Sequence, residues 1–65
     1  MTMTRQANGL YHVTIKGTIY WIALSSMGWH YGSYDDDFAG EGYFNTRKDA
    51  LGDLVQALGT LDAAG

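Results

Sequence analysis

The chain contains no cysteine, which in a protein of only 65 residues limits what can hold a fold together. A domain of about 60 residues buries only roughly 60% of the surface that its unfolded chain exposes, so small proteins often add disulfide bonds or a structural metal. Neither a disulfide bond nor a thiolate zinc site is possible without cysteine. We therefore expect one domain that depends on an apolar core, as a monomer or a weak dimer.

Three segments in the first half of the chain have the periodicity of β-strands. The first alternates apolar and polar residues, and the second contains a continuous apolar run that favours a central strand covered on both faces. Glycine-containing turns, Lys16-Gly17 and the stretch that ends at Gly28, separate the segments and predict short hairpin connections. The predicted strands are residues 10–16, 18–25 and 29–34.

The two ends of the chain predict different structures. Residues 1–9 are polar and show no periodicity, so we expect a flexible lead-in before a single domain over residues 10–65. Near the C-terminus, Thr46 suits the N-cap of a helix and Asp49 follows as the acid of a capping box. Gly59 is placed to end this helix with a left-handed C-cap. The apolar stripe of the helix consists of Leu51, Leu54, Val55 and Leu58.

These elements predict an α+β fold, in which a three-stranded antiparallel meander is followed by one C-terminal helix packed on one face (β-β-β-α). A single helix leaves part of such a sheet open. The face that carries Tyr11 and the face that carries Trp29 are both candidates for an exposed binding surface.

Charge and aromatic residues are distributed unevenly along the chain. The net charge is −3, yet residues 17–46 contain four acidic residues and no lysine or arginine, while the remainder has four basic and three acidic residues. Eight of the nine aromatic residues lie between Tyr20 and Phe44, in the same cation-free stretch. Nucleic-acid binding depends on the neutralisation of phosphates by lysine and arginine, so this distribution argues against it and favours a basic protein partner.

The run of three aspartates at 35–37 has two interpretations, and both remain open. It is either a solvated loop that keeps a small domain in solution or part of a surface for a basic partner, to which nearby tyrosines add contact area. Asp49 and Asp53 are four residues apart on the predicted helix, a like-charge pair that costs roughly a few tenths of a kcal/mol and suggests surface use. The candidate partner-binding residues are Tyr31, Tyr34, Asp35, Asp36, Asp37, Glu41, Asp49 and Asp53.

Catalytic and metal sites receive little support from the sequence. The serines lack the strained elbow of a nucleophile, and we expect no enzymatic activity and no cofactor. A run that begins at Asp35 is similar to an EF-hand loop, but it has Ala39 and Thr46 where calcium ligands are required. His12 and His30 lie opposite the apolar residues of their strands and lack the spacing of a zinc site. A small enzyme or a looser metal site remains an alternative.

Membrane association is not expected. The longest apolar run has six residues, whereas a membrane-spanning helix needs about 20. The first residues contain no apolar signal region either, so we expect a cytoplasmic protein.

Two family resemblances concern the segment Gly42–Ala50, GYFNTRKDA, and the leucine-striped helix after it. This segment resembles the last strand and helix entry of AP2-type and integrase arm-binding domains, a likeness that implies a sheet used for DNA binding. That family binds DNA through basic and aromatic residues on its sheet, and the basic ones are missing here. The segment also resembles the same step in HicB-type antitoxins, which implies an acidic partner of a toxin.

A third resemblance is one of type. Small, cysteine-free, acidic single domains are similar to phage-encoded anti-CRISPR proteins, in particular to inhibitors of type I systems. This resemblance implies a protein of the bacterial cytoplasm that binds a Cas effector subunit and blocks its capture of DNA. The aspartates at 35–37 with Glu41, together with Asp49 and Asp53, would then act as limited phosphate mimics.

Overall fold

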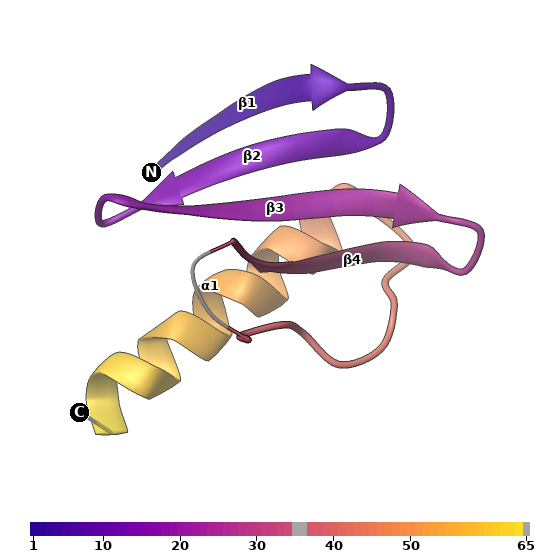
Figure 1. Ribbon diagram of the computed structural model, residues 1–65. Helices are drawn as coiled ribbons and strands as arrows, with labels where there is room; N and C mark the ends of the chain where they lie inside the picture. Colours follow the sequence, from indigo (N-terminus) through magenta and orange to yellow (C-terminus); the bar gives the residue numbers. More distant parts are fainter. Residues whose placement is uncertain (35–36, 65) are drawn as a thin grey trace.

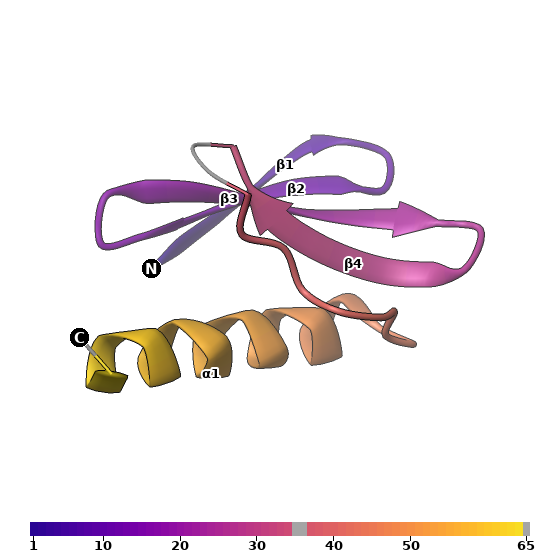
Figure 2. The same ribbon diagram turned by 60° about the horizontal axis from the view of Figure 1, so that its bottom comes forward.

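A computed structural model of the chain describes residues 1–34 and 37–64, with side chains as far as Gly59. Within these residues a four-stranded antiparallel sheet has the strand order β1-β2-β3-β4, and a helix lies along one face of the sheet (Figures 1 and 2). The predicted α+β class, with an antiparallel sheet and a C-terminal helix, is therefore confirmed. The elements are β1 (Thr2–Ala7), β2 (Leu10–Ile15), β3 (Thr18–Ser25), β4 (Gly28–Ser33) and α1 (Arg47–Ala64).

The prediction of three strands is wrong, because residues expected in a flexible lead-in form β1 at the edge of the sheet. β1 pairs with β2, so that Met3 lies opposite Val13 and packs against the core. The other residues of β1 are exposed, and the strand shows little apolar periodicity because backbone pairing holds it. The sequence signal for this hairpin lies in the turn after β1: Asn8-Gly9 is a favoured hairpin pair, and Gly9 has a φ of 80°.

Both predicted hairpin turns are present. Lys16 and Gly17 have positive φ angles, 52° and 82°, as a tight two-residue hairpin turn requires. Gly28 has a φ of 127°, and a Cβ atom built there would lie 2.8 Å from the carbonyl oxygen of Phe44. Glycine at this position therefore permits both the backbone conformation and the close approach of the chain that follows β4.

The segment between β4 and α1 folds back along the outer edge of β4. Trp29 and Phe44 exchange two backbone hydrogen bonds of 2.8 Å, and the Gly40 N–H donates to the carbonyl of Tyr31. The chain passes so close that a Cβ at Gly40 would lie 2.3 Å from Cζ of the Tyr31 ring. This pairing satisfies backbone groups along an edge strand and brings residues 37–44 beside the sheet.

Helix α1 begins as predicted but extends further. The Asp49 N–H donates to the hydroxyl oxygen of Thr46 at 3.0 Å, which confirms the N-cap. The predicted C-cap at Gly59 is wrong, since α1 continues to Ala64. Gly59 does not have a positive φ, and the alanines beyond it favour a continued helix.

The core lies between α1 and one face of the sheet. Tyr11 and Trp29 both belong to this face, where their ring centroids are 6.1 Å apart, so the two faces that we named as alternatives are one and the same. The buried residues of the core are Val13, Ile22, Tyr31, Ala50 and Leu54.

Strand β3 is central, as predicted, but only one of its faces is covered. Ile22 is fully buried on the helix side, whereas Ile19 on the other side is 45% exposed. The reason is geometric: α1 lies beneath β3 and β4 on a single side of the sheet (Figure 2). We refer to the sheet face opposite α1 as the open face.

Candidate functional site

The open face carries an unusual number of rings. The register places His12, Trp21 and Gly32 in one row across β2, β3 and β4, with His30 in the next row toward the β3–β4 turn. Two tyrosines from the ends of the loop after β4 complete the group. We call these five side chains the ring surface: His12, Trp21, His30, Tyr34 and Tyr43.

One half of the ring surface is a chain of three rings in contact. The centroids of Trp21 and His30 are 5.0 Å apart in an edge-to-face arrangement, and those of His30 and Tyr43 are 5.3 Å apart. The indole of Trp21 lies against the backbone of Gly32, where an added Cβ would be only 2.4 Å from its Cζ2 atom. Glycine in the middle of β4 therefore allows a large ring to lie low on the sheet.

The other half is a histidine–tyrosine pair. His12 Nε2 and the Tyr34 hydroxyl are 2.6 Å apart, within hydrogen-bond distance, and the two rings meet edge to face with centroids 5.1 Å apart. Tyr34 is nevertheless 56% exposed, and Tyr43 at the far end of the surface is 46% exposed. These contacts order the rings but leave much of their area to solvent.

The acidic side chains that the structure describes outside the core lie in two places, the loop after β4 and the first turn of α1. Asp37 and Glu41 are exposed in the loop that begins at Tyr34 and ends at Tyr43. Each carboxylate is therefore within three residues of a tyrosine of the ring surface. Asp49 is exposed in the first turn of α1. The other two members of the aspartate run, at positions 35 and 36, lie outside the described residues.

Two predicted contact residues have a structural role instead. Tyr31 is only 2% exposed, so its ring belongs to the core and cannot serve as a contact surface. Its hydroxyl donates a 2.5 Å hydrogen bond to the half-buried carboxylate of Asp53 on α1. Burial, together with the hydrogen bond and the negative charge of Asp53, raises the pKa of Tyr31 well above its usual range. The pair thus ties α1 to β4.

The basic residues lie away from the ring surface. Arg47 stacks on the helix side of the sheet, with its guanidinium carbon 4.3 Å from the centroid of the Tyr11 ring. Arg5 pairs with Tyr11 in the β1–β2 register and so belongs to the same side. Lys16 lies by a cleft between the β2–β3 turn and α1. The ring surface is therefore separated from these three cations.

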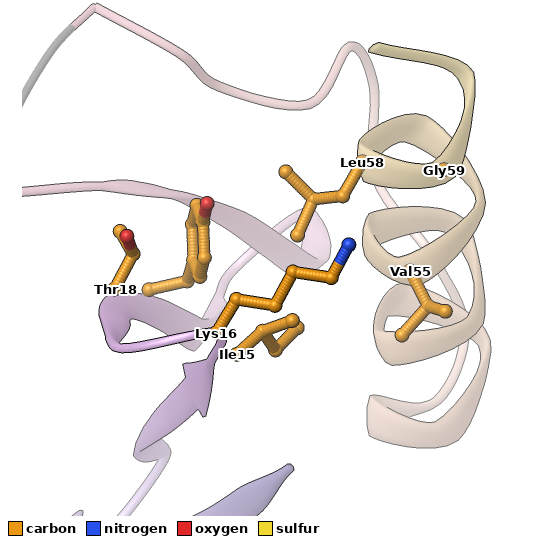
Figure 3. A pocket seen from close by; sticks show the side chains of 7 residues that line it. Ile15, Lys16, Thr18, Val55, Leu58 and Gly59 are labelled. Carbon is orange, nitrogen blue, oxygen red and sulfur yellow. The ribbon is translucent and has the colours of Figure 1, made fainter. Parts of the chain in front are cut away.

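That cleft is a separate feature of the described part of the chain. It has a volume of about 370 Å³ and opens between the β2–β3 hairpin and the second half of α1, on the side opposite the ring surface (Figure 3). Its walls are mainly apolar, and Figure 3 shows the Lys16 side chain reaching across it toward the helix. The lining residues are Ile15, Lys16, Thr18, Tyr20, Val55, Leu58 and Gly59.

The described residues offer few other functional groupings. Among them, no three histidine or carboxylate side chains gather closely enough to hold a metal ion. Nor does the described part of the chain contain a helix with the length and hydropathy to cross a bilayer.

Sequence reasoning found Tyr34 and the acidic loop but missed most of the ring surface. His12 and His30 were noted only as lying opposite apolar residues, and Trp21 was assigned to a strand covered on both faces. Strand alternation already put these three side chains on the polar side of the sheet, and that was the available signal. The contact between His30 and Tyr43 depends on the loop folding back, which no local pattern predicts.

Comparison with known proteins identifies no relative: neither a protein-family model, nor a curated protein, nor a solved structure matches the chain.

Proposed function

We propose that this protein is a non-enzymatic binding module that covers a basic, nucleic-acid-binding surface of a partner protein, with a Cas effector subunit of a type I system as the first candidate. One observation carries the proposal. The exposed carboxylates of Asp37 and Glu41 lie on a loop that starts and ends in the ring surface, within a stretch of thirty residues that contains no cation. Acidic groups beside large amphipathic rings suit a partner rich in lysine and arginine.

The size of the molecule supports the use of the whole open face. Its accessible surface is 4416 Å², and a standard protein–protein interface takes about 800 Å² from each partner, roughly a fifth of this total. A single loop is too small to supply that area. The open face spans roughly 20 Å in each direction, from strand spacings of about 4.8 Å and rises of about 3.4 Å per residue. That corresponds to a flat area of roughly 400 Å², about half of the standard value, so an interface of that size needs both the open face and the loop.

Charge mimicry can supply only part of the affinity. A DNA duplex carries one charge per about 1.7 Å of its axis, so the four acidic residues of the loop after β4 correspond to only about 7 Å of duplex. The acids would therefore steer the encounter with a basic groove, and the rings would provide most of the buried contact. Inhibition should consequently weaken as salt is added, mainly through slower association.

The test compares two variants with the same net charge. Asp37→Asn/Glu41→Gln removes two carboxylates from the loop, and Gly52→Lys/Gln56→Lys adds two cations on the exposed side of α1, away from the open face; each changes the net charge from −3 to −1. In an assay of DNA capture by a type I effector complex, we expect the first variant to inhibit several-fold less well and the second to inhibit as the unmodified protein does. Equal loss in both would mean that only net charge matters and would contradict the proposed surface.

Co-purification from the native host identifies the partner class. A large Cas subunit supports the proposal. A small basic toxin would instead indicate an antitoxin that uses the same acidic loop, and it would replace the anti-CRISPR assignment. Charge reversal of the complete run, with lysine at positions 35, 36 and 37, should abolish inhibition and leave the circular dichroism spectrum unchanged; normal inhibition by this variant would rule out phosphate mimicry.

A further inference from the structure

The ring surface is a poor fit for most kinds of occupant. Proteins that stack nucleic-acid bases on aromatic side chains also place lysine and arginine along the phosphates, and the stretch from Gly17 to Thr46 has neither. An acidic partner would be repelled by Asp37 and Glu41, which are exposed in the loop between Tyr34 and Tyr43. Cationic side chains of a partner are the groups that fit such a surface.

Aromatic faces attract cations, and tryptophan does so most strongly. Arginine suits such a surface better than lysine, because its guanidinium is planar, weakly hydrated and able to stack on a ring while it donates to a carboxylate. This molecule already contains one such contact, since the guanidinium of Arg47 lies over Tyr11 on the helix side of the sheet. The open face presents rings of the same kind with no arginine of its own among the described residues.

We infer that the ring surface is a subsite for arginine side chains of the partner, which stack on Trp21, Tyr34 and Tyr43 and pair with the carboxylates of Asp37 and Glu41. The two histidines contact the rings and hold them in place: His30 lies between Trp21 and Tyr43, and His12 meets the Tyr34 ring edge to face. This inference rests on the proposed function in supposing a basic partner, but it names the chemical group that is recognised.

The two tryptophans make the inference directly testable, because one lies on each face of the sheet. Trp21 belongs to the ring surface, and Trp29 packs against Tyr11 on the covered side. A nitrogen-15 correlation spectrum reports the one indole N–H group of each tryptophan, so Trp29 serves as an internal reference. The protein is titrated with a short peptide that contains two arginines, with the same peptide carrying lysine, and with one carrying citrulline, which is neutral and close in shape.

We expect the arginine peptide to shift the Trp21 signal and to leave the Trp29 signal in place. The lysine peptide should bind several-fold more weakly, and the citrulline peptide should produce no saturable shift. Equal binding of arginine and citrulline peptides would show a general apolar surface and overturn the inference. So would a Trp21 signal unaffected by any peptide, or a dimer in analytical ultracentrifugation whose contact covers the ring surface.

A matched pair of variants at an exposed ring tests the stacking itself. Tyr34→Ala removes the ring, whereas Tyr34→Phe keeps the ring and removes only the hydroxyl that bonds His12. Loss of one exposed cation–π contact weakens binding by roughly two- to fivefold, so we expect that change for Tyr34→Ala and almost none for Tyr34→Phe. Equal affinity of both variants would overturn the role of the ring. Peptide binding is measured without any Cas protein, so a protein that binds arginine but does not inhibit DNA capture would contradict the proposed partner and leave this subsite intact.

Discussion

Both faces of the sheet carry aromatic rings, but the rings have different environments. On each face the rings contact one another. On the helix side the rings of Tyr11, Trp29 and Tyr31 pack under α1, and the Tyr31 hydroxyl finds a carboxylate. On the open face Trp21 and His30 pack against one another and against loop residues, yet they stay partly exposed. The difference teaches that an aromatic ring does not by itself mark the core face of a small sheet; the rings become core where the single helix covers them together with apolar neighbours.

The largest expected effect compares two isoleucines of the same strand. Ile22 is fully buried under α1 and Ile19 is 45% exposed on the open face. Ile22→Ala should lower the free energy of unfolding by about 2–5 kcal/mol, because it leaves a cavity, and Ile19→Ala by less than about 1 kcal/mol. Urea denaturation followed by circular dichroism measures both.

Because a domain of this size has little stability to lose, Ile22→Ala can fail to fold. Ile22→Val then replaces it, with an expected loss of about 0.5–1.5 kcal/mol. Equal losses at the two positions would break the comparison, since they would mean that the open face is buried in solution.

The next effect concerns the glycine under the indole. A Cβ at Gly32 would lie 2.4 Å from Trp21, so Gly32→Ala should force the ring away from the sheet and cost about 1–3 kcal/mol. Thermal unfolding measures the loss, and the Trp21 indole signal should move while that of Trp29 stays. An unchanged Trp21 signal would show that the indole does not rest on this strand.

A smaller effect separates the two tyrosine hydroxyls. Tyr31→Phe removes the hydrogen bond to Asp53 and should destabilise the fold by about 1–2 kcal/mol, whereas Tyr34→Phe on the open face should cost less than about 0.5 kcal/mol. Urea unfolding at neutral pH compares the two variants. A larger loss from Tyr34→Phe would mean that the open face, and not the core, depends on its hydroxyl group.

The Tyr31 hydroxyl predicts an alkaline limit to the stability of the fold. The pKa of the Tyr31 hydroxyl is raised in the folded state. As pH rises, this hydroxyl therefore loses its proton in the unfolded chain, near the ordinary tyrosine pKa of about 10, before it does so in the folded protein. Stability contributed by Tyr31 is therefore complete below pH 10 and falls as pH rises beyond it. The melting temperature between pH 8 and 11 should decline less steeply in Tyr31→Phe than in the unmodified protein; parallel declines would contradict the assignment.

The smallest effect has the opposite sign. Gly52 lies on the exposed side of α1, and a Cβ there meets no atom within 4 Å. Gly52→Ala should therefore stabilise the helix by about 0.5–1 kcal/mol and leave both faces of the sheet unchanged. A rise in melting temperature without a change in either indole signal is the expected result, and destabilisation would indicate that this side of the helix is in contact with something.

Much of the fold was predictable because its signals are local. The alternation of β2, the Lys16-Gly17 turn and the Thr46 cap each depend on a few neighbouring residues, and each is present in the structure. β1 was missed because pairing with β2, and not its own composition, holds it in the sheet. Gly59 was mistaken for a helix end because its C-cap preference was weighed without the helix-favouring residues that follow.

The candidate site was predictable only in part. Charges are readable from composition, so the acidic loop and its cation-free surroundings stood out at once. Tyr31 was predicted to be a contact residue because it lies near acidic residues in the sequence. The sequence does not show whether its hydroxyl bonds a partner protein or, as it does, the half-buried carboxylate of Asp53 in the same chain. That the acidic loop contacts a partner remains a prediction.

The sequence alone determined which residues share a side of each strand, where the chain turns, and that no cation lies between Gly17 and Thr46. These properties follow from backbone geometry and residue chemistry over short distances. Only the tertiary structure decided which side α1 covers and which rings meet across the open face. The physical reason is that burial and ring contacts depend on strand register and on the loop that folds back along β4, and both are set by residues far apart in the chain.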